Sequence, residues 1–325
     1  MKYFLIMNPG SKGGKSKNNF NKIFEALTKA KIDYEYKYTN ELGDAYKYSV
    51  EANKLEFDVI VAVGGDGTIN GVLNGFFNLK GELISNSKMG VIYTGTSPDF
   101  CKSYNIPIKT DDAIKTLIDN YTSPIYIGKL LCSAENNKNF NYASSSKITI
   151  PKIIYFGCCA NIGLGATLAR KANSGIRKYL GDTLGTFISL LVTLVTYKAN
   201  DLTIKKDEKE LIINKLYNLS IGRTKYIASG IKVCNKISFN EEGFYCLTVS
   251  NLHFFNLPSL IKKVYCGTEF SNSKYLSLDY ANKIEIYGNY QNPEVEIDGD
   301  PIGYLPCKIE TSIDKLSLIV KKEIR

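Results

Sequence analysis

Three glycines, a carboxylate and a hydroxyl stand together in Gly64–Thr68, directly behind the apolar run Phe57–Val63. The run predicts a buried strand, and the glycine-rich segment predicts a turn into a helix that begins near Thr68. Glycines let backbone N–H groups approach a phosphate, and a helix N-terminus attracts negative charge. Asp66 opposes anion binding unless a metal ion or a transferable proton is also present. The segment therefore indicates phosphoryl transfer, with Asp66 holding Mg²⁺ or accepting a hydroxyl proton.

A second glycine-rich segment spans Asn8–Ser16, behind the strand predicted at Tyr3–Met7. It differs from a Walker A loop because Pro9 occupies the position of the first glycine. A flexible strand-to-helix turn would explain it without any function. It can also bind phosphate, because its glycines free the backbone and its lysines supply positive charge; these residues are Gly10, Gly13, Gly14, Lys12 and Lys15.

Two further segments carry carboxylates. The loop Gly95–Phe100 follows a predicted strand, although a turn-forming Pro-Asp pair would also explain it. Near the C-terminus, Glu296–Pro301 contains the hairpin turn signal Asp298-Gly299. Its three carboxylates would repel one another unless a cation or a solvent-filled cleft receives them.

The first third of the chain alternates strands with helices, which predicts a parallel βαβ sheet. Ligand sites of such sheets lie at the C-terminal ends of the strands, and three of the segments above follow such ends. The expected strands are Tyr3–Met7, Ile32–Tyr38, Phe57–Val63 and Met89–Tyr93, and the expected helices are Ser16–Ala30, Ala45–Lys54, Thr68–Phe77 and Thr110–Asn120.

From about Ile125 the pattern changes to short strands separated by polar turns. It predicts a larger, antiparallel β-rich domain, interrupted by a helical block over Ala166–Ala199. The expected domains are 1–127 and 128–310. The expected strands of this part are Ile148–Cys159, Leu211–Ser220, Thr224–Ala228, Phe244–Ser250, Lys283–Ile286 and Leu316–Val320.

Composition narrows the functional classes. Forty-one Lys and Arg against 32 Asp and Glu give the 325-residue chain a net charge of +9, which suits an anionic partner. No nucleic-acid-binding signature appears, and His253 is the only histidine, which disfavours a zinc site. The eight cysteines show no CxxC spacing and are expected to be reduced thiols of a cytosolic protein. The longest apolar run, Leu184–Tyr197, is shorter than the ~20 residues that span a bilayer.

Together the four segments resemble the diacylglycerol kinase catalytic family, in particular its soluble bacterial lipid kinases, which are related to sphingosine kinases. In that family an Asn-Pro-x-x-Gly loop, a Gly-Gly-Asp-Gly-Thr loop and a Gly-Thr-x-x-Asp-Phe loop build the nucleotide site. A late Asp-Gly-Glu hairpin of the second domain faces them across a cleft. The motifs occur here in family order from Asn8 to Asp300. The Gly-Gly-Asp-Gly-Thr element is shared with NAD kinases, but the Asn-Pro-Gly-Ser opening and the late hairpin favour the lipid branch.

The chain departs from the family pattern at four positions. Gly71 stands where Glu is usual, Pro98 where Asn is usual, and Tyr126 where many members carry Asp. Asp300 shortens the final Glu of the hairpin. These changes could weaken Mg²⁺ coordination, change the acceptor, or mark a lapsed catalyst.

The resemblance implies an α/β fold with a Rossmann-like N-terminal domain, a larger antiparallel β-rich domain, a nucleotide cleft between them, and ATP and Mg²⁺ as cofactors. It also implies that 311–325 can return to the first domain. Asp66 and Asp300 are the expected catalytic residues, and these two with Glu242 are the expected metal contacts. The expected nucleotide contacts are Asn8, Gly10, Gly13, Gly14, Lys15, Gly64, Gly65, Gly67, Thr68, Thr96 and Asp99.

The expected substrate is the hydroxyl of diacylglycerol or a similar lipid alcohol. Such an enzyme would be cytoplasmic and would touch the membrane transiently, either through Leu184–Tyr197 or through Leu252, Phe254, Phe255, Leu257 and Leu260. A homodimer is possible, and no nucleic-acid partner is expected. Two alternatives stay open: a kinase for NAD or another soluble alcohol, and a catalytically lapsed lipid-binding protein.

Overall fold

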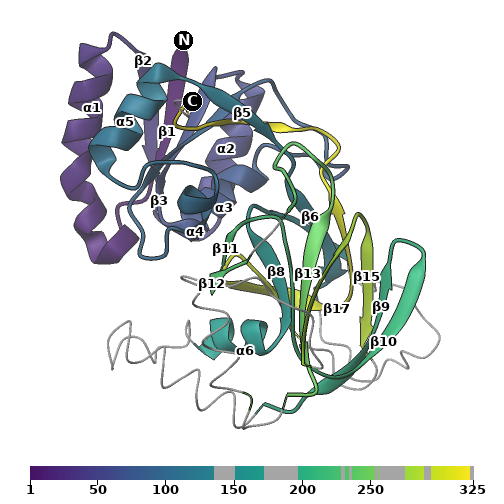
Figure 1. Cartoon of the computed structure of the whole chain (residues 1–325). Coiled ribbons are helices and arrows are strands. Elements are labelled where there is room, and N and C mark those ends of the chain that lie inside the picture. The colour runs from purple at the N-terminus through teal and green to yellow at the C-terminus, as the bar shows by residue number, and fades with distance from the viewer. Residues whose placement is uncertain are drawn as a thin grey trace.

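The chain forms an α/β domain and a β-rich domain (Figure 1). The structure is a computed structural model that describes residues 1–134, 151–171, 197–227, 231–233, 236–252, 256, 275–288 and 294–322. The α/β domain is built on a six-stranded sheet in the order β2-β1-β3-β4-β18-β5. Its strands are β1 (Lys2–Met7), β2 (Asp33–Tyr38), β3 (Val59–Gly64), β4 (Lys88–Tyr93), β5 (Thr122–Ile125) and β18 (Leu316–Ile319).

Helices cover both faces of this sheet, and each face has its own apolar core. One core packs β1 and β3 against α1 and α5, and the other packs the opposite sheet face against α2, α3 and α4 (Figure 1). Every residue of β3 is buried because both faces are covered, as its continuous apolar sequence predicts. The helices are α1 (Phe20–Lys29), α2 (Asp44–Lys54), α3 (Asp66–Asn74), α4 (Asp99–Ser103) and α5 (Thr110–Asp119).

Helices α1 and α3 differ from the sequence prediction by more than one residue, and α3 ends at Asn74 rather than at Phe77. The first helix does not begin at Ser16: a 3₁₀ segment, η1 (Ser11–Asn19), precedes α1. Lys12, Gly13 and Gly14 have positive φ angles of 52°, 65° and 87°, which an α-helix of L-residues does not tolerate. Helix α3 begins two residues earlier than expected, at Asp66.

The second domain contains a closed barrel. Strand β9 pairs with both β10 and β15, which closes β10, β8, β16, β17, β15 and β9 into a ring. The strands are β6 (Gly128–Ser133), β7 (Pro151–Phe156), β8 (Cys159–Gly163), β9 (Asn200–Lys206), β10 (Lys209–Gly222), β11 (Tyr226–Ile227), β12 (Ile231–Lys232), β13 (Phe244–Ser250), β14 (Leu276–Ala281), β15 (Ile284–Gly288), β16 (Glu294–Ile297) and β17 (Asp300–Thr311).

Several predictions for this domain need correction. The single strand expected over Ile148–Cys159 is wrong, because a turn at Gly157 separates β7 from β8. Only β11 is a strand within Thr224–Ala228. Helix α6 (Leu164–Lys171) begins the expected helical block, whose residues 172–196 lie outside the described residues. Leu252 is buried rather than exposed, and Phe254, Phe255, Leu257 and Leu260 lie outside the described residues.

The C-terminal end of the chain lies on the first domain (Figure 1). Strand β18 runs parallel to β4 and antiparallel to β5, so it completes the first sheet rather than the barrel. Among the helices in the described part of the chain, none combines the length and apolarity needed to cross a bilayer.

The two domains share a packed junction. The Asn74 side chain accepts a hydrogen bond from the Tyr155 backbone N–H at 2.7 Å and donates one to the Tyr155 carbonyl at 2.8 Å. The Tyr104 hydroxyl donates to the Gly157 carbonyl at 2.7 Å. These bonds fasten α3 and the end of α4 to β7 and its following turn, which places elements of both domains around one site.

Candidate active site

The strand order places a crevice between β1 and β3. Strand β1 pairs in parallel with β2 on one side and with β3 on the other. The order in which strands are added to the sheet reverses at β1, and ligands of open α/β sheets bind at such a switch point, beyond the C-terminal ends of the strands. The loop after β1 and the loop after β3 border this crevice. The sequence motifs predicted to bind phosphate therefore lie where the topology predicts a ligand.

The loop after β3 leads into α3 without an intervening linker. A Cβ on Gly64 would overlap the Thr68 side chain, so only glycine fits there. No side chain caps the N-terminus of α3, and its first N–H groups are available to an anion. Thr68 lies inside the first turn, where its hydroxyl accepts a hydrogen bond from Asn8 Nδ2 at 3.0 Å.

The loop after β1 is held open by its own polar groups. Asn8 Oδ1 accepts a hydrogen bond from Gly10 N at 2.9 Å, and the Asn8 carbonyl accepts one from Ser16 Oγ at 2.8 Å. Nothing lies within 4 Å of a Cβ built on Gly13 or Gly14. Their glycine requirement comes from the positive φ angles, which curve the backbone around an open space.

The loop after β4 contacts both of the others. The Ser11 hydroxyl donates to the Thr94 carbonyl at 3.1 Å. A Cβ on Gly95 would lie 2.8 Å from Gly65 Cα, so this close approach needs glycine. Thr96 is exposed at the mouth of the loop, and Asp99 begins α4, with its N–H donating to the Ser97 carbonyl at 2.9 Å. The three predicted loops therefore converge.

Asp66 stands at the start of α3 with an unusual carboxyl group. Tyr93 donates its hydroxyl to Asp66 Oδ2 at 3.2 Å. Burial raises the pKa of Asp66 to about 7; the negative charges of Asp298 and Asp99 add to this rise, and the Tyr93 hydrogen bond opposes it. A carboxyl with a pKa near neutrality can accept a proton and release it again at physiological pH.

The hairpin between β16 and β17 brings the second domain to the same place. Its turn residues Asp298 and Gly299 have φ angles of 48° and 99°, as a type I′ turn requires. Asp300 follows the turn and is exposed, and its Oδ2 lies 3.8 Å from the position of a Cβ on Gly67. The structure thus brings Asp66 and Asp300 to the first turn of α3 from opposite domains.

Asp298 has a structural role that the sequence did not predict. Its Oδ1 accepts the N–H groups of Cys158 and Cys159 at 2.9 and 3.0 Å. Its Oδ2 accepts the N–H of Gly157 at 2.8 Å and the Asn70 amide at 3.2 Å. This carboxylate fastens the hairpin to the β7–β8 turn and to α3. An Asp-Gly pair is a sufficient turn signal, so nothing in the sequence identified these partners.

The buried carboxyl group of Glu296 also stabilises the hairpin. Glu296 accepts hydrogen bonds from Asn161 Nδ2 at 2.7 Å and from the Gly299 N–H. Burial raises the pKa of Glu296 to about 7, and hydrogen bonds from Gly299 and Asn161 oppose the rise. Two of the three hairpin carboxylates therefore hold the turn, and the third, Asp300, lies beside Gly67 in the first turn of α3.

Glu242 lies in a different environment. It accepts a hydrogen bond from the Tyr126 hydroxyl at 3.3 Å. Next to it, the buried guanidinium of Arg223 donates to the carbonyl oxygens of Glu241 and Gly243. No group of three His, Cys, Asp or Glu side chains within the described ranges could hold a metal ion by itself. The structure therefore does not bring Glu242 together with Asp66 and Asp300.

The Asp66 and Asp300 pair still fits Mg²⁺. This ion is usually bound by one or two carboxylates, with substrate phosphates and water completing its six ligands. The open backbone of Gly10–Gly14 and the uncapped N-terminus of α3 suit the phosphates that such a site needs.

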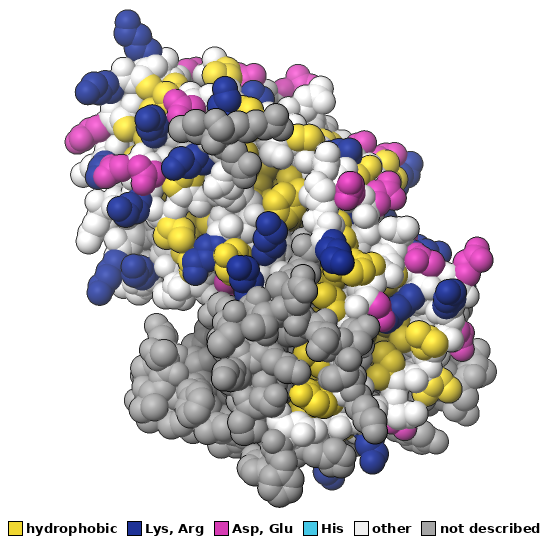
Figure 2. Space-filling model, in the orientation of Figure 1, with side chains coloured by type: hydrophobic (Ala, Val, Ile, Leu, Met, Phe, Trp, Pro, Cys, Tyr) yellow, Lys and Arg dark blue, Asp and Glu magenta, His cyan; other side chains and the backbone are white. Residues whose placement is uncertain are grey.

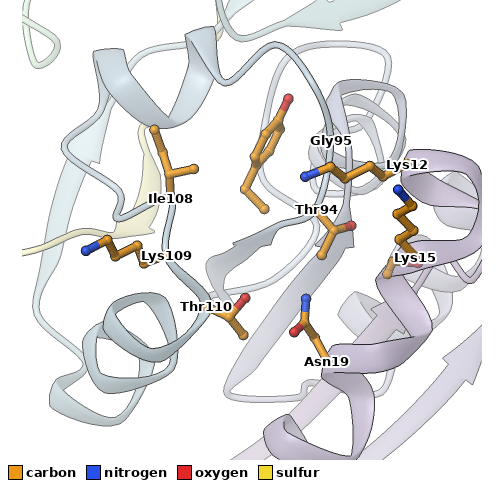
Figure 3. A pocket seen from close by; sticks show the side chains of 10 residues that line it. Lys12, Lys15, Asn19, Thr94, Gly95, Ile108, Lys109 and Thr110 are labelled. Carbon is orange, nitrogen blue, oxygen red and sulfur yellow. The ribbon is translucent and has the colours of Figure 1, made fainter.

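A cavity of about 250 Å³ lies behind the loop after β1, between η1 and α5 (Figure 3). Lys12 and Lys15 line this cavity. The Lys15 side chain therefore lies on the side of the loop after β1 that faces α5. The other lining residues are Ser16, Asn19, Tyr93, Thr94, Gly95, Ile108, Lys109 and Thr110.

Two of the departures from the family pattern have local explanations. A Cβ on Gly71 would lie 2.8 Å from the Ala45 Cβ of α2, so the close packing of α2 against α3 excludes a larger residue. The Tyr126 ring stacks against the Lys315 ammonium at 4.8 Å. Nothing in the described structure explains Pro98, whose carbonyl accepts the Lys102 N–H at 2.9 Å as that of any residue could.

The parallel sheet with its glycine loops, joined to a β-barrel domain that adds a carboxylate, defines a two-domain phosphotransferase. Residues 2–130 match the family model of the diacylglycerol kinase catalytic domain. This part of the chain therefore matches a diacylglycerol kinase catalytic domain, and the protein is a phosphotransferase of the lipid kinase class.

Relatives match far beyond that domain. The chain is 26% identical over 326 residues to a diacylglycerol kinase of Staphylococcus epidermidis, covering 98% of this chain and 92% of the relative. It is 24% identical over 323 residues to a diacylglycerol kinase of Bacillus subtilis, covering 98% and 96%. The crystal structure of a putative diacylglycerol kinase from Bacillus anthracis matches with a TM-score of 0.74 at 23% identity, covering 98% and 97%. This last likeness confirms the two-domain fold.

Proposed function

We propose that the protein transfers the γ-phosphate of ATP to the hydroxyl of diacylglycerol or a similar lipid alcohol, with Mg²⁺ as cofactor. The observation that carries the proposal is the meeting of Asp66 and Asp300 at the uncapped N-terminus of α3. An anion site bordered by two carboxylates from different domains suits a charged nucleotide, a divalent cation and a second substrate between the domains.

In this proposal the backbone of Gly10–Gly14 and the N–H groups of Gly67 and Thr68 bind the phosphates. Asp66 accepts the proton of the lipid hydroxyl as the new oxygen–phosphorus bond forms. The bond between the γ-phosphorus and its bridging oxygen breaks, and ADP leaves. Asp66 and Asp300 would hold Mg²⁺, which supplies neutralisation of the developing phosphoryl charge.

The hydrogen bonds of Asp298 support this role because they fix the distance between the two domains at the site. Asp298 binds three backbone N–H groups and Asn70 of α3. The hairpin that carries Asp300 is therefore anchored to the helix that carries Asp66. Such preorganisation lowers the cost of arranging charged groups during the transfer.

A lipid acceptor requires contact with a membrane surface, and we propose that the protein associates with it peripherally from the cytoplasm. On the β9–β10 hairpin, Leu211 and Ile212 are 50% and 66% exposed. Figure 2 shows hydrophobic side chains among charged ones on this side of the β-rich domain. Consecutive exposed apolar residues of a strand turn to both faces of the hairpin, so the hairpin can insert shallowly among headgroups.

Sedimentation with vesicles tests this surface. Changing Leu211 and Ile212 together to Ser should reduce binding to vesicles that contain diacylglycerol and an anionic lipid. The matched control is Leu42→Ser, because Leu42 is fully exposed on the other domain. Equal binding by all three proteins would contradict a role of the hairpin. The homodimer is a further proposal, which light scattering in solution decides.

The activity test is transfer of ³²P from labelled ATP in mixed micelles that carry a panel of lipid alcohols, with Mg²⁺ or with EDTA. We expect Mg²⁺-dependent label in one lipid and none with Asp66→Asn. Asp111→Asn is the control, since Asp111 pairs with Lys22 on the exposed side of α5 at 2.5 Å. Label in NAD or another soluble alcohol would mean that the phosphate acceptor is a soluble alcohol rather than a lipid. ATP binding without any transfer would indicate a lapsed catalyst.

A further inference from the structure

Strand β2 forms a free edge of the first sheet. It pairs with β1 on one side, and within the described part of the chain no strand pairs with it on the other. Strand β5, which leads into the β-rich domain, forms the opposite edge, so β2 and its neighbour α1 lie away from that domain (Figure 1). Proteins often block a free edge with a bulge or a proline, because it can accept a strand of another chain. Strand β2 has neither, and its register with β1 is regular over Asp33–Tyr38.

The backbone groups of three tyrosines face the open side of β2. The Thr39 N–H, just after the strand, donates to the Met7 carbonyl of β1 at 2.9 Å. The N–H and C=O groups of successive residues in a strand point to opposite sides, so the odd-numbered residues of β2 turn theirs toward β1. The even-numbered residues turn theirs outward; these are Tyr34, Tyr36 and Tyr38. Each of them therefore offers one donor and one acceptor to a further strand.

The side chains of the same tyrosines form an aromatic row beside α1. Tyr36 and Tyr38 are 46% and 39% exposed, and their ring centroids lie 5.3 Å apart. The Phe24 ring of α1 lies 4.7 Å from the Tyr36 ring and is stacked on the Tyr34 ring at 5.6 Å. Aromatic residues are enriched at protein–protein interfaces, where they bury a large area. The combination of an open strand edge with an exposed aromatic row suits another polypeptide chain.

The charges of β2 select a second copy of this chain as the partner. Two copies related by a two-fold axis pair equivalent strands antiparallel, and the outward groups then require tyrosine opposite tyrosine. With Tyr36 on the axis, Glu35 of each copy lies opposite Lys37 of the other, and the remaining tyrosines pair with each other. A register centred on Glu35 or on Lys37 would place that residue opposite itself, and like charges directly opposite are destabilising. Only the register centred on Tyr36 avoids such a contact.

Helix α1 leaves room for the second copy. Its buried residues share a core with β1, and Phe24 contacts the tyrosines of β2, so α1 packs over the β1–β2 pair. Neighbouring strands lie about 4.8 Å apart, which would place the two α1 helices of a joined sheet about 10 Å apart. Packed helices are separated by about 8–10 Å. The two helices would therefore cover the joined strands side by side without a clash.

We propose that β2 is the interface of a homodimer, in which the first sheets of two copies join edge to edge into one continuous sheet. Lys37 already holds Glu51 of α2 at 2.7 Å, but its ammonium group has three donors and can also bind Glu35 of the second copy. These charges alternate with the tyrosines along β2, so they lie on the sheet face opposite the aromatic row. The inference concerns association alone and does not rest on the proposed kinase activity.

Light scattering and sedimentation velocity of the full chain test the interface by charge complementation. We expect the wild type to approach twice the mass of one chain as its concentration rises. Glu35→Lys and Lys37→Glu each convert both cross-strand ion pairs into like-charge pairs, so each variant should associate about tenfold more weakly than the wild type. An equimolar mixture of the two variants should restore the dimer, because both cross-strand pairs then join opposite charges. A variant that had merely lost its fold would not regain association in this way.

Tyr36→Pro tests the backbone contact separately, because proline removes an N–H group that β1 does not use. It should abolish the dimer, and circular dichroism checks that the variant folds. The control is Asp119→Lys, which makes the same charge change as Glu35→Lys on an exposed residue at the end of α5 and should leave the dimer unchanged. A wild type that stays monomeric at every concentration would overturn the proposal and leave the edge to a different partner. A dimer that survives both charge variants, or a mixture that does not reassociate, would overturn it as well.

Discussion

The close approach of α2 and α3 gives a prediction that can be worked from the structure. Gly71 of α3 faces Ala45 of α2, and Gly75, the C-cap of α3, faces Ser49 of α2, so the contacts repeat every four positions on both helices. A methyl group added to Gly71 would lie 2.8 Å from Ala45 Cβ, and 3.4 Å from the Tyr46 nitrogen. Carbon atoms in contact are separated by about 3.5–4.0 Å, so Gly71→Ala requires the helices to move apart by about 1 Å.

The net effect on stability is the difference between two terms. Overpacking of a tight contact costs about 1–3 kcal/mol, whereas replacing a helical glycine by alanine gains about 1 kcal/mol from helix propensity. We therefore expect Gly71→Ala to lower the free energy of unfolding by about 1 kcal/mol. Activity should fall as well, because a shift of α3 stretches the 3.2 Å bond between Asn70 and Asp298.

Urea unfolding and a double-mutant cycle measure the steric term. Ala45→Gly makes room for the new methyl, so the pair Gly71→Ala with Ala45→Gly should regain about 1–3 kcal/mol over the sum of the single changes. The control for propensity is Gly67→Ala on the same helix, where the nearest atom to the new Cβ is 3.8 Å away. If Gly71→Ala stabilises the protein as much as Gly67→Ala does, and the cycle shows no coupling, the packing argument is wrong. The position would then be free to carry a larger residue.

Four further predictions concern the buried charges. If Asp66 accepts the proton of the lipid hydroxyl, the transfer rate should rise with pH through the pKa of its carboxyl. That pKa is about 7 without Mg²⁺ and is lowered by a bound cation, so the rise should lie below neutrality in the Mg²⁺-loaded enzyme, and a flat pH–rate profile would exclude the role. The folded pKa lies above the ordinary 3.8, so without Mg²⁺ the stability of the wild type should fall as pH rises from about 4 to about 7. In urea titrations Asp66→Asn should make this fall smaller, and the part that comes from Glu296, whose pKa is also raised to about 7, should remain. Asp298→Asn should cost about 2–4 kcal/mol in urea unfolding, since it removes a charged acceptor from three backbone N–H groups; a loss below 1 kcal/mol would contradict its anchoring role. Arg223→Met should lower the free energy of unfolding by about 2–4 kcal/mol, because it leaves the buried carbonyls of Glu241 and Gly243 without their donor. The control is Lys22→Met at an exposed ion pair, which should change the free energy of unfolding by less than about 0.5 kcal/mol.

The local sequence was sufficient for the α/β domain. An apolar run such as Val59–Val63 can only be a strand covered on both faces, and a glycine segment behind it can only be the turn that follows. The fold class is confirmed, and the three loops converge as the strand ends require. The start of α1 was misplaced because side-chain periodicity does not distinguish a 3₁₀ turn from an α-helical one, and residues 16–19 belong to the 3₁₀ segment η1.

The topology of the β-rich domain could not be predicted from the sequence, because the residues of a short strand do not indicate which other strands it pairs with. The pairing of β9 with both β10 and β15 depends on contacts between residues far apart in sequence. The same holds for Leu252, which is buried in the core beside Cys159 although its neighbourhood reads as an exposed apolar segment.

The sequence by itself determined which chemistry is available, because glycine loops and carboxylates at strand ends are properties of neighbouring residues. Only the tertiary structure decided how each carboxylate is used. Asp298 and Asp300 are two residues apart, yet one binds the turn of another strand pair and the other faces α3. Burial and the backbone N–H groups of distant segments make that distinction, and both arise when the two domains pack together.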